Sequence, residues 1–258
     1  MATKTIIITC PYCKSEKVSK NGHNATGKQV YKCNNQECDR STFVDGYTYK
    51  AYDPEIRSQV LKMAVNCTGT RATGRILGIS KDTVTAILKK NESWNWQVNY
   101  DYLDEKQNIE IEIISSDELE CDEVEMDEMW SFVYKKSQQY WLWWAIDHKT
   151  GVPLAYCFGT KEHKYLDELL ALLSPFNIDV VYADDNQAYQ KRIKNSKLIT
   201  GKRNTQKIER KHLSLRTWCA RLVRKGIRFS KSYIMHKIVV GLVINFWFFC
   251  RDLPLQLF

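Results

Sequence analysis

The residues of this chain that suggest chemistry are three acids far apart in the sequence, Asp127, Asp184 and Glu209. Glu209 is the single acid in the stretch 202–216, KRNTQKIERKHLSLR, which holds six lysines and arginines and one histidine. Carboxylates that lie close together repel one another unless cations neutralise them, and their hard oxygen atoms select Mg²⁺ or Mn²⁺. Two such ions about 4 Å apart clamp a phosphodiester and activate the attacking water or hydroxyl. The three acids therefore predict metal-dependent phosphodiester chemistry, provided that the fold brings them together.

The basic residues around Glu209 fit a polyanionic substrate. Arg216 lies two helical turns after Glu209 on the same helical face, so we expect it to reach a phosphate beside the metals. Five further side chains are predicted to hold the DNA backbone: Lys202, Arg203, Lys207, Arg210 and Lys211. Taken singly, each acid has a plainer role: a surface ion pair for Glu209, a turn or cap for Asp184 and Asp185, and a hairpin turn for Asp147.

The elements that must position these acids follow one another in a recognisable order. Stretches rich in β-branched and aromatic residues predict an antiparallel meander at 125–136, 140–151 and 151–159. A helical pattern at 165–173 and a buried strand at 178–185 come next. The basic stretch then continues as a helix that carries Ile208, Leu215 and Leu222 at seven-residue intervals on one face.

Three strands, a helix, a strand and a helix form the element order of a ribonuclease-H-like α/β fold. In that order Asp127 lies within the first strand, Asp184 lies at the C-terminal end of the fourth strand, and Glu209 lies on a helix packed across the sheet. The order therefore predicts that the three carboxylates meet at one edge of the sheet.

The N-terminal segment contains a pattern typical of a structural metal site. Cys10 and Cys13 in CPYC are followed, after 19 residues, by Cys33 and Cys38 in CNNQEC. Two cysteine pairs on two turns offer four thiolates to a tetrahedral Zn²⁺, which supplies folding energy to a stretch too short to build its own core. The plainer alternative is a set of unpaired core cysteines. Between the pairs, the hairpin pattern of residues 20–33 suits a zinc ribbon.

A helix-turn-helix pattern follows the cysteines. Asp53 as N-cap and Pro54 at the first helical position begin one predicted helix, TRATGRILG predicts a second that ends at Gly78, and Ser80 caps a third. The last helix of such a motif enters the major groove, although any three-helix bundle has similar spacing. The side chains of this third helix that we expect to contact DNA are Lys81, Thr85, Lys89 and Lys90.

Charge is distributed unevenly along the 258 residues. Residues 1–91 hold 15 basic and 7 acidic side chains, residues 92–128 hold 1 and 14, and residues 129–258 hold 22 and 9. Basic blocks of this size favour a polyanionic partner because each neutralised phosphate releases counterions. The acidic middle, which includes Asp122 and Glu123, is predicted to be a linker with a short strand at 108–114, or a segment that covers a basic surface until DNA displaces it.

The composition also limits where the protein acts. The longest apolar run, 238–249, is interrupted by Asn245 and is too short to span a bilayer, so we expect a buried helix or an oligomer contact and no membrane partner. Nine cysteines without an apolar N-terminal signal segment favour a reducing, cytoplasmic setting. The predicted domains are a zinc ribbon at 1–48, a helix-turn-helix at 49–91, an acidic linker at 92–123 and a catalytic domain at 124–258.

At several motifs the chain resembles the transposases of the insertion sequence 1 family. The resemblance rests on EMDEMW, LLSPFNIDVVYADDNQAY, TQKIERKHLSLR and ARLVRKGIRFSKS in the C-terminal half, and on CPYC through GRILGISKDTVTAILKK in the N-terminal half. It implies a prokaryotic DDE recombinase with Asp127, Asp184 and Glu209 as ligands of Mg²⁺ or Mn²⁺, and with Arg216 as the basic residue seven positions after the glutamate. Asp185 stands where the family has glycine; Asp184 is preferred because its spacing to Tyr189 matches the family pattern.

The implied activity is cleavage at the 3′ ends of an insertion sequence and transfer of those ends to target DNA. The implied partners are double-stranded DNA, at the terminal inverted repeats and the target, and at least a second copy of the chain. Two other interpretations stay open. One is a non-catalytic regulator that uses only the zinc ribbon and the helix-turn-helix; the other is a structure-specific nuclease of the same fold that stops after hydrolysis.

Overall fold

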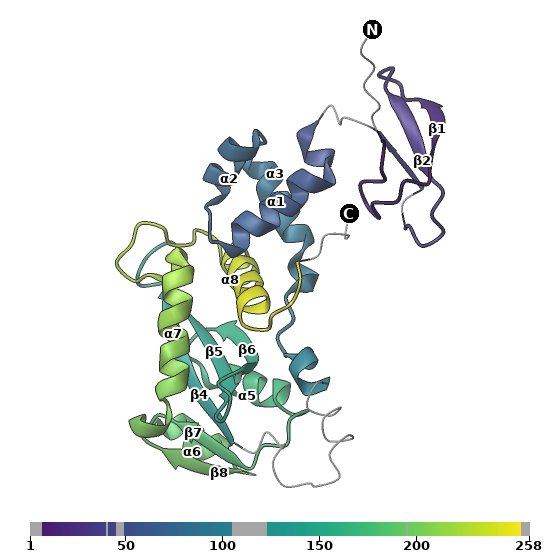
Figure 1. Cartoon of the computed structure of the whole chain (residues 1–258). Coiled ribbons are helices and arrows are strands. Elements are labelled where there is room, and N and C mark those ends of the chain that lie inside the picture. Colours follow the sequence, from purple (N-terminus) through teal and green to yellow (C-terminus); the bar gives the residue numbers. More distant parts are fainter. Residues whose placement is uncertain (1–6, 40, 45–48, 105–122, 195, 254–258) are drawn as a thin grey trace, which may run out of the picture. The chain divides into compact units, whose positions relative to one another are not determined.

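The computed structural model describes residues 7–39, 41–44, 49–104, 123–194 and 196–253 (Figure 1). The chain forms two compact units, of which the first comprises residues 1–63, 70–87 and 253–258 and the second comprises residues 64–69 and 88–252. The predicted strand at 108–114 lies outside the described residues, as does the rest of 105–122 in the acidic middle, so its covering role stays a prediction.

The N-terminal part of the first unit is a small antiparallel sheet. Strands β1 (Val18–His23), β2 (Gln29–Cys33) and β3 (Thr42–Val44) pair in that order, so the predicted hairpin between the cysteine pairs is present. Its apolar centre is small: among the residues that the structure describes there, Cys10, Cys33 and Phe43 are the buried ones. A core of this size needs support from another source, such as a bound metal.

Three helices form the rest of the first unit: α1 (Pro54–Val65), α2 (Thr70–Leu77) and α3 (Lys81–Lys90). Asp53 accepts the Glu55 N–H at 2.9 Å and Ser80 accepts the Thr83 N–H at 3.0 Å, so both predicted N-caps are confirmed. Gly78 ends α2 with a φ of 67°, a conformation that glycine adopts without strain. The short turn from α2 to α3 gives the helix-turn-helix layout.

The second unit contains a five-stranded mixed sheet. Its strands are β4 (Glu123–Phe132), β5 (Gln139–Asp147), β6 (Pro153–Gly159), β7 (Val180–Ala183) and β8 (Lys197–Thr200), in the order β6-β5-β4-β7-β8. Strands β4, β5 and β6 are antiparallel, whereas β7 and β8 run parallel to β4. This is the strand order of a ribonuclease-H-like fold, as the sequence predicted.

Helices cover both faces of this sheet (Figure 1). The helices α5 (His163–Leu172) and α6 (Gln187–Arg192) accompany one apolar cluster, in which Met126 and Trp143 meet Leu166 and Tyr189. The helices α7 (Gln206–Trp218) and α8 (Tyr233–Trp247) accompany the other, on the side of Trp144. Because successive strand residues point to opposite faces, neighbouring positions of β4 enter different environments.

The apolar run near the C-terminus is the buried helix α8, one of its two predicted roles. Asn245 in this helix is fully buried, and its side-chain amide donates to the Trp96 carbonyl and to the Tyr156 hydroxyl, each at 3.0 Å. These bonds satisfy the polar group that interrupts the apolar pattern. No helix within the described ranges combines the length and the apolar character that a membrane crossing needs.

Three details of the predicted catalytic domain were wrong or missed. Helix α6 and strand β8 were not predicted, because elements of six and four residues are too short to produce a clear periodicity. Helix α7 ends at Trp218, so Leu222 does not continue its face; it lies in a separate 3₁₀ turn, Ala220–Leu222. Leu222 is nevertheless buried in the same apolar cluster as Ile208 and Leu215, which explains the misleading heptad spacing.

Candidate active site

The sheet places two of the three predicted acids at equivalent positions on neighbouring strands. The last parallel pair between β4 and β7 is Met126 with Ala183, and the next residues along the two strands are Asp127 and Asp184. Adjacent strands lie about 4.8 Å apart, so both carboxylates start from the same edge of the sheet. Beyond this point β7 has ended, and the pairing of β4 with β7 stops.

Helix α7 brings Glu209 to the same place through an anchor at its first turn. The carboxylate of Glu125, buried on β4, accepts the Ile208 N–H at 2.9 Å and pairs with His148 Nδ1 at 2.8 Å. The hydrogen bond from Ile208 satisfies one of the backbone N–H groups that have no partner within the helix at its start. Ile208 is fully buried, so the next residue, Glu209, faces outward from the first turn.

The charges of Asp184 and Glu209 both affect the pKa of Asp127. The pKa of Asp127 is raised to about 7, mainly because the side chain is desolvated and also because Glu128, Asp184 and Glu209 carry like charges close by. A hydrogen bond from the Glu128 N–H at 2.8 Å acts in the opposite direction. An acid at this pKa lacks a sufficient counter-charge, and a divalent cation shared with Asp184 and Glu209 would supply it.

His212, which the sequence did not suggest, lies against Asp127. Its Nε2 accepts the Trp144 indole N–H at 2.7 Å, so the ring proton is on Nδ1, which lies 3.5 Å from the Asp127 carboxylate. Burial, and then the positive charges of Arg216 and Arg224, lower the pKa of His212 to about 3, so the ring is neutral near pH 7. The neutral histidine therefore lies beside Asp127 without balancing its charge.

Glu128 is another residue near Asp127 that the sequence analysis did not indicate. It points to the opposite face of β4 from Asp127 and accepts a hydrogen bond from the Tyr189 hydroxyl at 2.9 Å. The pKa of Glu128 is raised, mainly by burial, while the positive charge of Lys161 opposes that effect. The sequence contained one indication of this contact: the spacing between Asp184 and Tyr189, which places the tyrosine near the acids at the end of β7.

The predicted basic residues have different surroundings. Arg216 is half-buried on α7, and its pKa responds to the charge of Asp127, which places it next to the acids. Lys207 instead donates to the carbonyls of His148 and Lys149 in the β5–β6 turn, and Lys211 lies over the Phe248 ring at 5.6 Å. Lys207 is nevertheless exposed, as are Lys202, Arg203 and Arg210.

The remaining acids differ clearly from this group. Asp185 is exposed and accepts a hydrogen bond from Gln190 at 3.2 Å, whereas Asp184 is half-buried. Asp147 accepts the Lys149 N–H at 2.7 Å, which is the turn role expected for it. Glu123 lies at the start of β4, and Asp122 lies outside the described residues.

The sequence matches family models across both halves. Residues 119–250 match the model described as IS1 transposase, and residues 47–92 match the model described as InsA C-terminal domain, a helix-turn-helix. The chain belongs to the IS1 transposase family. The IS1 family assignment agrees with the ribonuclease-H-like topology and with the helix-turn-helix that precedes it.

Two InsB proteins support the same assignment. The InsB protein of insertion element iso-IS1n from Shigella dysenteriae is 49% identical over 121 residues, which cover 47% of this chain and 92% of that protein. The InsB protein of insertion element IS1 9 from Escherichia coli K12 is 41% identical over 130 residues, 50% of this chain and 77% of that one. Among solved structures, the catalytic core domain of BIV integrase matches 48% of this chain and 82% of its own, with 14% identity and a TM-score of 0.34.

In the part of this IS1-family chain that matches the helix-turn-helix model, α3 presents a polar face. Val84, Ile87 and Leu88 are buried, as expected for the inner face. Lys81, Lys89 and Lys90 are exposed, and the hydroxyl of Thr85 donates to the Lys81 carbonyl at 3.0 Å. These positions are where the predicted DNA contacts lie.

The four predicted zinc ligands gather in one cluster. The sulfur atoms of these residues all lie within 4.8 Å of one another: Cys10, Cys13, Cys33 and Cys38. The Cys10–Cys38 and Cys13–Cys33 sulfur distances are 3.8 and 3.6 Å. Tetrahedral zinc with Zn–S bonds of about 2.3 Å requires sulfur atoms about 3.8 Å apart, so this set fits the metal. Mainly through a hydrogen bond with the Ser15 backbone, the pKa of Cys13 is lowered to about 6, which favours the thiolate.

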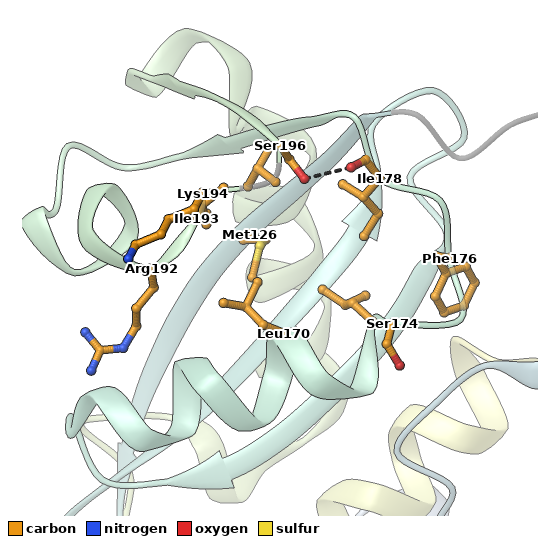
Figure 2. Close-up of a pocket in the computed structure, with 11 residues that line it drawn as sticks. Met126, Leu170, Ser174, Phe176, Ile178, Arg192, Ile193, Lys194 and Ser196 are labelled. Atoms are coloured by element: carbon orange, nitrogen blue, oxygen red, sulfur yellow. Dashed lines mark hydrogen bonds between the residues drawn. The ribbon is translucent and has the colours of Figure 1, made fainter.

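A separate hollow lies on the α5 side of the sheet and has a volume of about 480 Å³ (Figure 2). Met126, Leu170 and Ile178 are among its lining residues, and the Ser196 hydroxyl donates to the Ile178 carbonyl at 2.7 Å. The guanidinium of Arg192 at its rim is already paired with Asp167 at 2.6 Å. None of the predicted catalytic acids lines this hollow.

Proposed function

We propose that the chain is a DDE transposase that binds the terminal inverted repeats of an insertion sequence, cleaves at their 3′ ends and joins those ends to target DNA. The observation that carries this proposal is the meeting of Asp127 and Asp184 at equivalent strand positions, with Glu209 close enough to raise the pKa of Asp127. A helix-turn-helix in the same chain supports a DNA substrate.

The three carboxylates are suited to hold Mg²⁺ or Mn²⁺, because they offer oxygen ligands and because their like charges make a bound divalent cation favourable. When bound, such ions activate the attacking oxygen and stabilise the leaving oxygen of a phosphodiester. His212 directs its Nδ1–H toward the Asp127 carboxylate, 3.5 Å away, and the hydrogen bond from Trp144 to Nε2 fixes that tautomer. Arg216 is placed to bind a phosphate oxygen next to the acids.

The chemistry consists of two displacements at phosphorus. Water first attacks the phosphodiester at the element end, and the bond to the 3′ oxygen breaks to leave a free 3′-hydroxyl. That hydroxyl then attacks a target phosphodiester, so a new phosphodiester forms as a target 3′ oxygen leaves. Positioning by the protein supplies much of the rate, and no covalent protein intermediate is required.

The Cys10, Cys13, Cys33 and Cys38 cluster would hold a structural Zn²⁺, and the N-terminal modules would bind the element ends. Because two ends must be joined to one target, we expect at least a dimer in the DNA complex and a location with the bacterial DNA. The exposed side chains Lys202, Arg203 and Arg210 extend the DNA surface beside Glu209. Lys207 and Lys211 would contribute less, since each is already engaged within the protein.

Substitution of Glu209 by alanine tests the proposal. We expect Glu209→Ala to reduce cleavage of a DNA end at least about a thousandfold, because one of three ligands is removed, while end binding stays within about twofold. Asp185→Asn is the matched control, and we expect it to retain activity because Asp185 faces solvent. Cleavage by Glu209→Ala at the native rate, or loss of end binding in that variant, would contradict the assignment.

The nuclease alternative is separated by a second substrate. A transposase joins a pre-cleaved 3′ end to target DNA, whereas an enzyme limited to hydrolysis does not. The regulator alternative predicts that residues 1–91 alone reproduce all activity and that the three acids are replaceable.

A further inference from the structure

A basic hollow lies at the C-terminal end of α7 and contains residues that the sequence did not indicate. Its lining consists of Arg216, Thr217, Val223, Arg224 and Lys225, and its volume is about 480 Å³. Three of these five residues carry cationic side chains and none is acidic, while the Thr217 hydroxyl donates to the Leu213 carbonyl at 3.0 Å. This composition is complementary to an anion that carries several acceptor oxygens.

The segment that carries Arg224 is fixed beside the part of β4 that continues past β7. Val133 forms a parallel bridge with Ser230, and the Tyr134 N–H donates to the Ser230 carbonyl at 2.7 Å. The Arg221 guanidinium donates to the Ser230 hydroxyl at 3.2 Å, which closes this segment into a loop. Arg224 itself lies over the ring of Trp130 on β4, with its guanidinium carbon 4.6 Å from the ring centroid. The stacking holds the arginine in place without using its hydrogen-bond donors.

Within the described part of the chain, neither guanidinium group of this hollow forms an ion pair with a carboxylate. The Nε of Arg216 is buried and has no hydrogen-bond partner among those residues. Burial and the nearby charge of Arg224 both lower the pKa of Arg216, so the two guanidinium groups repel each other. An unpaired buried donor and two close like charges are both unfavourable, and both are relieved when an anion binds.

We propose that this hollow binds a backbone phosphate of the DNA strand that is cleaved at the acidic site, a few nucleotides from the cleaved phosphodiester. Arg224 is its main ligand, and Trp130 supports Arg224. The inference rests on the proposed function and names a second contact on the same substrate. Trp130 lies three residues after Asp127, about 10 Å further along β4; its side chain leaves the opposite face of the strand, at the edge that is no longer paired with β7. Since the rise per nucleotide is about 3.4 Å, the bound phosphate lies within about three nucleotides of the cleaved one.

The test replaces single DNA phosphates with neutral methylphosphonates at the three positions on each side of the cleavage site. For the full chain, we expect one of these positions to reduce cleavage about tenfold, since one charge-assisted contact is lost. Arg224→Gln should reduce cleavage of unmodified DNA by a similar factor and should be insensitive to the methylphosphonate at that position. Arg228→Gln is the matched control, because Arg228 is an exposed arginine of the same loop that does not line the hollow.

A binding measurement without added divalent metal makes the result independent of catalysis. The slope of log affinity against log salt should fall by about 0.9 in Arg224→Gln and should stay unchanged in Arg228→Gln, because one phosphate contact is lost. An unchanged slope, or Arg224→Gln that responds to every methylphosphonate like the native chain, overturns the inference. If the native chain does not cleave DNA but Arg224→Gln still lowers the slope, the proposed function fails and this phosphate site stands.

Discussion

At the scale of single residues, Asp127 is where burial and charge act together. Only 17% of its side chain is exposed, and the nearby carboxylates of Glu128, Asp184 and Glu209 add to the cost of ionising it. The result is a pKa of about 7, at which an ordinary aspartate would already be ionised. His212 does not relieve the charge, because its own pKa is lowered to about 3.

This pKa predicts that divalent metal binding depends on pH. Metal binds the ionised carboxylate, so Asp127 must release its proton, and affinity falls as pH decreases through 7. We expect Mn²⁺ to bind about tenfold more weakly at pH 6 than at pH 8, with about half a proton released per site at pH 7. Calorimetry in buffers of different ionisation enthalpy measures both quantities. Asp184→Asn, which removes a ligand, should abolish the binding heat; pH-independent affinity would show that Asp127 is not a ligand.

Sequence alone indicated which acids belong together but not what surrounds them. Asp127, Asp184 and Glu209 were linked by their order along predicted elements, which is a property of the sequence. His212 was missed because a histidine within a basic stretch suggests a DNA contact, and only the packing of α7 against β5 brings it to Trp144 and Asp127. Lys207 stays a predicted DNA contact, but the sequence did not indicate that its amine also donates to the Lys149 carbonyl.

At the scale of elements, the contact between Glu125 and the start of α7 determines where Glu209 lies. Glu125 is 1% exposed, and its two oxygen atoms bind the Ile208 N–H and His148. A buried carboxylate in a strand is tolerated because each oxygen has a partner and because the helix start carries a partial positive charge. The hydrogen bond between the Ile208 N–H and Glu125 also fixes the start of α7 beside β4.

Glu125→Ala should therefore destabilise the catalytic unit by about 3 kcal/mol, because it leaves a buried N–H unpaired and opens a cavity. Glu123→Ala, on the same strand but a third exposed, should cost less than about 1 kcal/mol. Urea unfolding followed by tryptophan fluorescence measures the difference. All eight tryptophans lie at positions 94–247, so this signal reports on the second unit alone. Equal stability losses in the two variants would show that the helix anchor is unimportant.

The predictability of the elements follows their length and their turn chemistry. The three long strands and the capped helices α1 and α3 were predicted, because each has ten or so residues of clear period or a defined cap. The short elements α6 and β8 were missed, and α7 was extended too far. Cys219, with φ −108° and ψ 88°, ends α7, and no glycine or proline in the sequence marks that position.

At the scale of the whole molecule, the two units obtain their stability from different sources. The second unit has large apolar clusters on both faces of its sheet. Among the described residues of the N-terminal sheet region, the buried apolar cluster consists of Phe43 and two of the four clustered cysteines, Cys10 and Cys33. When the metal is removed, we expect the N-terminal sheet to unfold while the catalytic unit stays folded, because a core that depends on metal unfolds without it.

Zinc removal tests this difference directly. We expect the purified chain to release one Zn²⁺ on chelation, to lose the β-sheet signals of residues 18–44 in NMR spectra, and to keep its tryptophan-detected unfolding midpoint. Cys13→Ser should prevent zinc binding, since three thiolates leave the tetrahedron incomplete, and should weaken element-end binding at least about tenfold. Cys250→Ser, at an exposed cysteine outside the cluster, is the matched control and should retain the metal. Retention of a folded sheet in the metal-free protein, or a parallel fall in the tryptophan midpoint, would contradict a separate, zinc-dependent module. The expected result would make the ribbon a detachable DNA-binding part, whose loss leaves the acidic site formed but deprives it of its correct DNA ends.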